Sequence, residues 1–306
     1  MENLDKVAVV GGTGYTGREI VRILLRIGRP EIRILTGHPT RPHPFGERVK
    51  IFPLNFENKS ELRRALKGVR FIYNTYWVRF RRGNVSFEGA VSNTAKLFDA
   101  AREEGVERVV HISITNPSLT SPYGYFKGKA QVEELLKKSG LSYAILRPTI
   151  IFGLGDILIN NMAWVMRRFR FFPLFGSGKY RVTPVYVGDV ASACVRYAHE
   201  EANLIRDCVG PETYTFRDLL KTIGSALGIR ALIFAAPKGF TMFLGKILSL
   251  YLGEPIVTGE EVGALMDGLL CSDAQPLGLT RFSEWVSQNS QVLGLKFASE
   301  IQRHYS

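Results

Sequence analysis

Two tyrosine-lysine pairs overlap in the run Tyr123-Gly-Tyr125-Phe-Lys127-Gly-Lys129, each with a spacing of four residues. On a helix this spacing places both side chains of a pair on one face, where an ammonium group can lower the pKa of a phenol. A tyrosine activated in this way can act as a general acid or base near neutral pH. The segment therefore predicts proton-transfer chemistry.

Helical geometry chooses between the two pairs, because residues two positions apart differ in direction by about 200°. The row of Tyr125 continues through Lys129 to apolar residues such as Leu136, which is typical of a face packed against the rest of the protein. The row of Tyr123 continues through Lys127 into polar residues, which indicates a solvated face. We expect Tyr125 and Lys129 to be the active pair, with Tyr123 and Lys127 as the alternative.

A glycine-rich turn follows the first apolar run of the chain. The strand-like segment 6–10 leads into Gly11-Gly-Thr-Gly14-Tyr-Thr-Gly17 and then into a helical pattern. Gly11 would allow the tight turn, Gly14 the approach of a pyrophosphate to the backbone, and Gly17 close packing of helix on strand. The helix N-terminus would add N–H groups and a positive dipole. The expected dinucleotide contacts in this turn are Gly11, Thr13, Gly14, Tyr15, Thr16 and Gly17.

The second strand-like segment, 31–36, bears on the type of dinucleotide. NAD(H) is usually held by an acidic side chain at the end of this strand, which binds the ribose 2′-hydroxyl. Here the chain continues as Thr36-Gly-His38-Pro-Thr-Arg41, with neutral and basic groups only. We therefore expect NADP(H) to be favoured over NAD(H), with His38 and Arg41 near the 2′-phosphate.

Strand and helix patterns alternate through the first half of the chain, which predicts parallel strands joined by crossover helices. The fold class expected is α/β, a doubly wound parallel sheet. The predicted strands are 6–10, 31–36, 49–54, 69–74, 108–113 and 143–147. The first predicted helix follows the glycine-rich turn and ends near residue 27, and the other predicted helices span 60–66, 85–104 and 123–139.

The alternation ends after Pro148, and the chain beyond Pro211 looks mainly helical, with capping patterns at Thr215 and Thr258. A strand at 182–187 and a helix from Asp189 look like a return to the sheet. We expect a dinucleotide-binding domain of residues 1–153 and 182–200, and a smaller, mainly helical substrate domain of residues 154–181 and 201–306.

These motifs together resemble the short-chain dehydrogenase/reductases of the extended or atypical kind, which are NAD-dependent epimerase/dehydratase-like proteins with a Rossmann fold. The resemblance covers GGTGYTG, the strand end at Asn74-Thr75, VVHIS with Ser113, YFKGKAQVE from Tyr125, LRPTIIFG and PVYVGDVA. Within that superfamily the chain is most similar to the branch that includes the nucleotide-binding accessory subunit of respiratory complex I. In that branch a glutamate follows the lysine by four residues, as Glu133 follows Lys129.

The resemblance implies roles for individual residues. Tyr125 would transfer the proton, Lys129 would also hold the nicotinamide ribose, and Ser113 or Thr115 would orient the reacting oxygen. Two positions depart from the family pattern: Ile114 stands where the serine often falls, and Ala90 where a helix asparagine is expected. Further expected cofactor contacts are Asn74, Thr75, Pro148 and Thr149.

Two classes of function fit these features. The first is an NAD(P)-dependent oxidoreductase or epimerase/dehydratase-type enzyme, with hydride transfer to or from a small-molecule substrate of unknown identity. The alternative is a structural or sensor subunit that holds NAD(P)H without turnover. Three scattered cysteines, Cys194, Cys208 and Cys271, have no metal-ligand spacing, so no metal site is expected. They indicate reduced thiols in a cytoplasmic protein, and we expect no signal peptide ahead of the first strand.

The net charge of +12 indicates an anionic partner. Residues 1–150 hold 25 basic and 14 acidic side chains, so this excess lies with the glycine turn and favours a phosphorylated cofactor over nucleic acid. Arginines mix with aromatics at 77–82 and 164–172, which predicts an apolar or acidic substrate or contact with a membrane surface. The apolar run 239–252 is shorter than the ~18 residues of a membrane span but suits an interfacial helix.

Overall fold

The computed structural model describes residues 6–28 and 31–304, and the chain divides into two compact units. The first unit comprises Met1–Pro148 and Val190–Asp207, and the second comprises Thr149–Asp189 and Cys208–Ser306. Each unit has a buried apolar core of its own.

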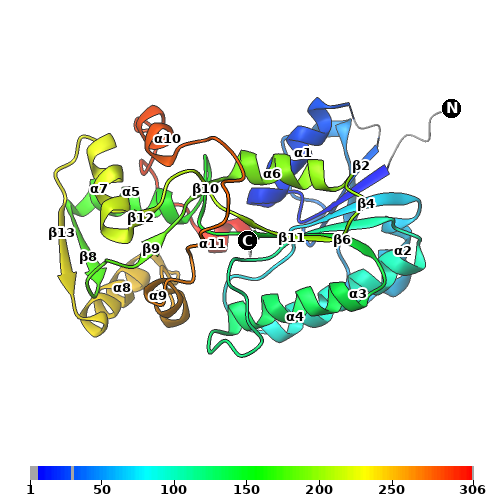
Figure 1. The fold of residues 1–306 in the computed structure, drawn as a ribbon, viewed down its shortest axis with the longest axis horizontal. Helices are drawn as coiled ribbons and strands as arrows, with labels where there is room; N and C mark the ends of the chain where they lie inside the picture. Colours follow the sequence, from blue (N-terminus) through cyan, green and yellow to red (C-terminus); the bar gives the residue numbers. More distant parts are fainter. Residues whose placement is uncertain (1–5, 29–30, 305–306) are drawn as a thin grey trace. The chain divides into compact units, whose positions relative to one another are not determined.

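The first unit is a seven-stranded sheet in the order β11-β6-β5-β4-β1-β2-β3, with helices on both faces. Helices α1 and α6 lie on one face, and α2, α3 and α4 lie on the other (Figure 1). The six strands from β1 to β6 pair in parallel. The elements are β1 (Lys6–Val10), α1 (Tyr15–Arg26), β2 (Glu31–Thr36), η1 (Gly46–Arg48), β3 (Lys50–Pro53), α2 (Lys59–Leu66), β4 (Val69–Asn74), α3 (Phe87–Glu103), β5 (Arg108–Ile112), α4 (Gly124–Lys138), β6 (Ser142–Pro148), α6 (Val187–Tyr197) and β11 (Leu204–Cys208).

Strand register places the ends of the central strands at one edge of the sheet. Val10 of β1 is paired with Asn74 of β4, and Asn74 is paired with His111 of β5. The turns that follow these strands therefore start side by side, because parallel strands end at the same edge. These turns carry the glycine motif, Thr75 and Ser113.

The helices form because each buries an apolar stripe against the sheet. In α1 the buried residues include Ile20, Val21 and Leu24, with successive spacings of one and three positions. In α4 the buried side chains include Val132 and Leu136, together with Lys129. The sheet strands β1 and β5 are buried along almost their whole length, as expected for strands covered on both faces.

The expected α/β fold class is confirmed, and the sequence pattern gave the bounds of β1, β2 and β4 as the structure has them. Residues 204–207, expected in the substrate domain, instead belong to the first unit, where β11 forms an edge of the sheet. The expected strand 182–187 is two short strands of the second unit, because Pro184 lacks the N–H that a continuous ladder needs.

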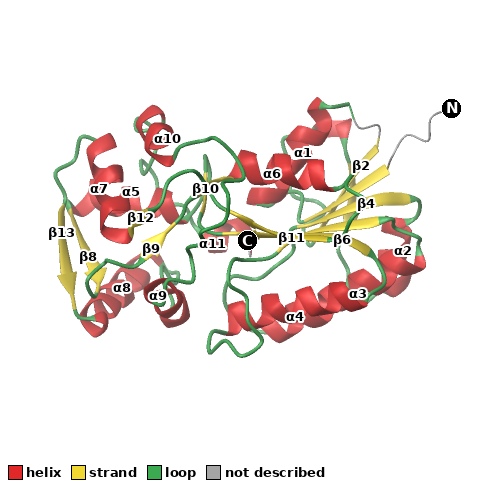
Figure 2. Ribbon diagram, viewed as in Figure 1, coloured by secondary structure: helices red, strands yellow, loops and turns green. Residues whose placement is uncertain are grey.

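The second unit contains helices and three two-stranded sheets, where a mainly helical region was expected (Figure 2). Strand β7 pairs with β10, β9 with β12, and β8 with β13. Thr258 forms the capping box of α9, as its sequence pattern predicted. The elements are β7 (Ile151–Phe152), α5 (Leu158–Phe169), β8 (Phe171–Phe175), β9 (Arg181–Val182), β10 (Val185–Tyr186), β12 (Tyr214–Thr215), α7 (Phe216–Ala226), β13 (Leu232–Ala236), α8 (Lys238–Leu252), α9 (Gly259–Met266), α10 (Phe282–Gln288) and α11 (Glu300–His304).

The arginine-aromatic segment 164–172 is not one element. Helix α5 ends at Phe169, Arg170 adopts a left-handed conformation with φ of 58°, and β8 starts at Phe171. Among the helices of residues 6–28 and 31–304, none combines the length and the apolar character that crossing a bilayer requires.

Candidate functional site

The glycine turn between β1 and α1 leaves no room for side chains. Gly11 has a φ of +76°, and a Cβ atom there would lie 2.8 Å from Oγ1 of Thr75. A Cβ atom on Gly17 would overlap the carbonyl group of Gly11, so glycine lets the helix pack directly on the turn. These are the roles that the motif spacing predicted for the tight turn and for helix packing.

The N-terminus of α1 has no side-chain cap. Its N-cap residue is Gly14, and no acidic residue occupies the first turn. The first N–H groups of a helix have no partner within the helix, and the dipole places positive charge there. The guanidinium of Arg18 donates to the carbonyl oxygen of Thr13 at 3.1 Å, which adds a cation beside the turn. The turn therefore fits the pyrophosphate of a dinucleotide.

The end of β2 lies beside this turn. The hydroxyl groups of Thr36 and Thr13 are 3.3 Å apart, and the backbone N–H of His38 donates to Oγ1 of Thr36. The backbone N–H of Arg41 donates to the carbonyl oxygen of His38 at 3.2 Å, so a turn brings these two basic residues together. No carboxylate stands between positions 32 and 46 of the sequence.

The two residues at the end of β4 join the neighbouring strands. Oγ1 of Thr75 donates to the carbonyl oxygen of Val10 at 2.8 Å, which ties β4 to the start of the glycine turn. The amide nitrogen of Asn74 lies 3.1 Å from Nδ1 of His111, and its side-chain oxygen accepts from the N–H of Tyr76. Asn74 and Thr75 thus hold the sheet edge in shape, and their contact with a cofactor stays a prediction.

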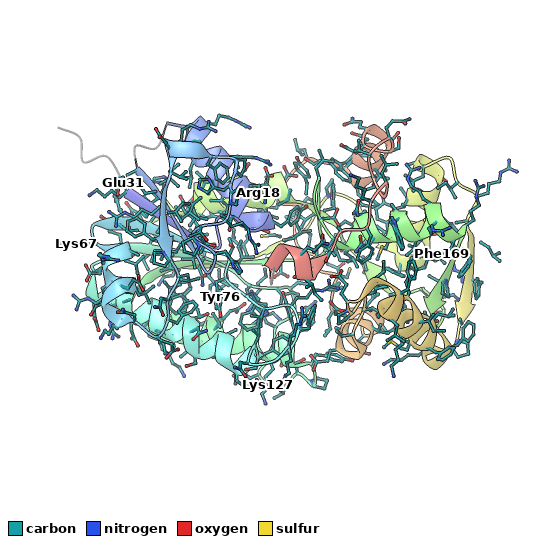
Figure 3. All side chains as sticks on the ribbon, turned by 180° about the vertical axis from the view of Figure 1, so that it is seen from behind. Arg18, Glu31, Lys67, Tyr76, Lys127 and Phe169 are labelled. Atoms are coloured by element: carbon teal, nitrogen blue, oxygen red, sulfur yellow. The ribbon has the colours of Figure 1, made fainter. Side chains whose placement is uncertain are left out.

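Helix α4 presents its two tyrosine-lysine pairs differently. Lys129 is buried with 2% of its surface exposed, and its ammonium donates to the carbonyl oxygen of Ile112 at 2.7 Å. Lys127 is exposed on the outer side of α4 (Figure 3). Both tyrosines are half-buried. Burial lowers the pKa of Lys129 from 10.5 to about 7, against the opposing effect of the Glu133 carboxylate.

Aromatic rings surround this pair. The ring of Trp77 lies 4.6 Å from the ammonium of Lys129, and the ring centroids of Trp77 and Tyr125 are 5.8 Å apart in an edge-on contact. Phe87 contacts both Trp77 and Tyr125. Gly128 permits this packing, because a Cβ atom there would lie 2.9 Å from the indole. Trp77 therefore shields the Lys129 ammonium from solvent and stabilises its positive charge by a cation–π contact.

Ser113 and Arg147 both bind Glu133, which is buried with 1% exposed. The hydroxyl of Ser113 donates to Oε1 of Glu133 at 2.5 Å. The guanidinium of Arg147 donates to both carboxylate oxygens, at 2.9 and 2.6 Å. This contact raises the pKa of Arg147. Ser113 was expected to orient a reacting oxygen, but its only proton is directed to Glu133 in this arrangement.

Two other polar groups near the end of β5 are fully buried. The hydroxyl of Thr115 has no hydrogen-bond partner among the described residues, although its backbone N–H donates to Pro148. Nε2 of His111 is likewise unpartnered within the part of the chain that the structure describes. Burial lowers the pKa of His111 well below 6.5, and the Lys129 ammonium lowers it further, so this ring is neutral.

Thr149, expected as a cofactor contact, begins the second unit. Its hydroxyl donates to the carbonyl oxygen of Thr183, and its backbone N–H donates to the carbonyl oxygen of Cys208 at 3.3 Å. Pro148, the other expected contact, is the last residue of β6. The side chain of Thr149 is therefore occupied within its own unit.

Sequence reasoning did not place His111 in the site and did not predict the contact between Glu133 and Arg147. It included Trp77 only as part of the arginine-aromatic segment 77–82. A signal existed for Glu133, which lies one helical turn after Lys129 and so shares its face. For Trp77 the only sequence signal was its position shortly after the end of a strand. In the same segment, Arg81 forms an ion pair with Glu88 at 2.6 Å. That contact accounts for one arginine of the segment 77–82.

Comparison with known proteins bears on the same residues. A sequence model of a family described as NAD(P)H-binding matches residues 11–153, which include the glycine turn, Tyr125 and Lys129. The mitochondrial NADH dehydrogenase (ubiquinone) 1 alpha subcomplex subunit 9 of Mus musculus is 27% identical over 305 residues, which cover 97% of this chain and 79% of that relative. The protein of the same name from Arabidopsis thaliana is 27% identical over 221 residues. That match covers 69% of this chain and 55% of the plant relative, so it spans about half of the plant protein's length.

Solved structures share the fold. An NADPH-dependent quinone oxidoreductase from Escherichia coli, complexed with NADPH, superposes with a TM-score of 0.76 at 18% identity, covering 92% of this chain and 99% of that chain. The matched family, the relatives and the fold agree with the glycine turn and the tyrosine-lysine helix. Residues 11–153 thus match the sequence pattern of an NAD(P)H-binding family, and the chain shares the fold of that quinone oxidoreductase.

Proposed function

We propose that this protein is an NADPH-dependent reductase of a small carbonyl or quinone substrate. The cofactor would be held by the glycine turn and the uncapped N-terminus of α1, whose open backbone fits a pyrophosphate. His38 and Arg41 would bind the 2′-phosphate, since the turn joins two basic residues and offers no carboxylate for a 2′-hydroxyl. When bound, the nicotinamide would supply hydride.

The chain's own residues would manage the proton. Tyr125 is the candidate general acid, and the Lys129 ammonium one helical turn away would stabilise the phenolate that forms. Thr115 is a better candidate than Ser113 for orienting the reacting oxygen, because its hydroxyl is unpartnered while that of Ser113 is directed to Glu133. The rings of Trp77 and Phe87 pack edge-on against the ring of Tyr125 and would help to hold it in place.

One observation carries this proposal: the chain buries a lysine at a pKa of about 7 beside the candidate tyrosine. Burying an ammonium group is unfavourable, and an apolar residue at the same position would stabilise the fold more. Strongly shifted pKa values concentrate at functional sites, where a group must gain or lose protons near neutral pH.

The proposal is tested by NADPH oxidation with para-benzoquinone and benzaldehyde as probe substrates. Tyr125→Phe should lower turnover by roughly 10²-fold or more while leaving NADPH affinity within about threefold, because only the proton donor is lost. Tyr123→Phe is the matched control and should behave as the wild type. Equal loss in both variants would contradict the assignment of Tyr125.

Cofactor choice has a separate test by calorimetry. Arg41→Ala should weaken NADPH binding by about tenfold and leave NADH binding unchanged, because only NADPH carries the 2′-phosphate. Lys50→Ala, a basic residue ion-paired with Glu31, is the control. Equal weakening of both nucleotides would remove the case for NADPH.

A second candidate function follows from Ser113. Because its hydroxyl is directed to Glu133, the protein would hold NADPH as a subunit of a larger assembly without turnover. The relatives, which are named as subunits of an NADH dehydrogenase, support this alternative. It predicts tight NADPH binding with no oxidation by either probe in wild type and Tyr125→Phe alike.

The cytoplasmic location stays a prediction.

A further inference from the structure

Helix α8 of the second unit is far more apolar than its burial explains. Of its 15 residues, KGFTMFLGKILSLYL, only Thr241 is buried. A helix that is apolar on most sides normally lies inside a core or against a membrane. Packing within the second unit therefore explains only a small part of the apolar character of α8.

The exposed apolar side chains of α8 gather on one face. Phe240 is 48% exposed, Phe243 59%, Ile247 49%, Leu250 84% and Tyr251 73%. At about 100° per residue these five positions fall within an arc of about 100°. Five large apolar side chains thus form a continuous stripe along the helix, which we term the α8 face.

The helix is held in place by its opposite side. Oγ1 of Thr241 donates to the carbonyl oxygen of Leu174 in β8 at 3.1 Å, and Gly245 lies against Val257. The backbone N–H of Ile256 donates to Oγ of Ser249 at 3.1 Å, which ties the chain after α8 back onto the helix. The α8 face is therefore presented on a fixed scaffold and needs no folding step on contact with a partner.

Further exposed apolar residues occur on the strands beside α8. Strand β8 pairs in parallel with β13, and Phe171 is the register partner of Leu232. Leu232 is 66% exposed and Phe171 is 38% exposed, with Phe169 close by at the end of α5 (Figure 3). Figure 1 shows β8, β13 and α8 together in the second unit.

Exposed cations accompany these elements without acidic partners. The segments 164–176 and 230–252 contain six basic residues and no acidic residue. Arg167 is bound to the carbonyl oxygens of Ser290 and Leu293. The other five are exposed, and none forms an ion pair within the described residues: Arg168, Arg170, Arg230, Lys238 and Lys246.

We propose that the α8 face docks on the surface of an anionic lipid bilayer. An apolar stripe bordered by cations matches the acyl boundary and the negative headgroups of such a surface. A second copy of this chain fits less well, because pairing of two α8 faces would bring unpaired lysines of both copies together. The helix would lie in the plane of the interface, since its length excludes a span.

The test is flotation of the full chain with vesicles of phosphatidylcholine alone or mixed with phosphatidylglycerol. The wild type should float with the mixed vesicles at low salt, bind phosphatidylcholine vesicles weakly, and lose binding as salt is raised. The double variant Phe243→Glu, Leu250→Glu should lower partitioning by at least tenfold, because it removes apolar contact area and adds negative charge. Both side chains are exposed, so the substitutions should leave the fold intact. Lys246→Gln should lower it by about fivefold.

Leu279→Glu is the matched control, since Leu279 is 93% exposed but lies outside α8. It should float as the wild type does, and circular dichroism should show that every variant is folded. Absence of flotation with the mixed vesicles at low salt would overturn the proposal. A dimer in sedimentation velocity that Phe243→Glu dissociates, with no vesicle binding, would overturn it in favour of a second copy.

Discussion

Basic side chains on the two units differ in their partners. In the first unit, several exposed cations are paired with carboxylates across elements, as in Lys59–Glu103, Arg63–Glu104 and Lys96–Glu57, with N–O distances from 2.6 to 2.8 Å. Its other exposed cations include some without an ion pair among the described residues, such as Arg26, Lys67 and Lys127. In the second unit, five exposed cations near β8, β13 and α8 have no such partner among the described residues. The first half holds most of the net positive charge, yet the second unit holds this group of unpaired cations.

This difference separates net charge from available charge. A cation already paired with a carboxylate attracts an anionic partner weakly, because the fields of the two opposite charges largely cancel at distances greater than the separation of the pair. The count over residues 1–150 correctly drew attention to the glycine turn, but it could not show which arginines were already occupied. Arg81 lies in the segment 77–82, for which the sequence suggested contact with a membrane or an acidic substrate, but it is paired with Glu88.

Within the first unit, buried and exposed ion pairs differ as well, and Glu133→Gln tests this difference most strongly. Removing this carboxylate leaves Arg147 half-buried without its anion, and we expect the free energy of unfolding to fall by about 3 kcal/mol. Urea unfolding followed by circular dichroism measures this change. The exposed ion pair Arg81–Glu88 offers a control, because Glu88→Gln should shift the urea unfolding midpoint little. If both variants unfold alike, the contrast between buried and exposed pairs is wrong.

The buried lysine predicts a pH dependence of stability. Because the pKa of Lys129 is about 7 in the folded chain and 10.5 when exposed, the unfolded chain binds more protons between these values. Stability should therefore rise with pH across this window, by up to about 1 kcal/mol per pH unit, and the penalty is complete below pH 7.

Lys129→Met removes this titration and should flatten the rise. Urea midpoints at several pH values within the window, for the wild type and the variant, measure the difference. Lys127→Met is the control, because Lys127 is exposed. Parallel profiles for wild type and Lys129→Met would show that the lysine is not desolvated in solution.

The paired and unpaired cations can be compared directly in vesicle binding. Lys246→Gln should lower partitioning onto anionic vesicles by about fivefold, whereas Lys96→Gln, which removes a cation paired with Glu57, should change it by less than about twofold. Equal effects would mean that net charge, and not pairing, governs attraction to the surface.

Arg81→Gln should have the smallest effect. Its side chain is exposed and paired, so neither vesicle partitioning nor the thermal midpoint should change measurably. A clear loss of partitioning in this variant would return the segment 77–82 to the membrane-contact role that its composition suggested.

Much of the first unit follows from local pattern. Period-2 and buried apolar runs located β1, β2 and β4, and helical spacing showed that Lys129, and not Lys127, lies on the buried face of α4. The same reasoning failed at residues 204–208, whose short, half-exposed strand has weak alternation. It failed again at Pro184, where the missing N–H divides the expected strand.

By itself, the sequence determined the glycine turn, the strand-helix alternation and the face of α4 that carries Tyr125 and Lys129, because each depends on residues close in the chain. Tertiary structure decided that Ser113 donates to Glu133, that Trp77 covers Lys129, and that the α8 face stays exposed. Periodicity reports which side of an element is apolar. Which distant residue meets that side, or whether any does, depends on packing between elements far apart in the sequence.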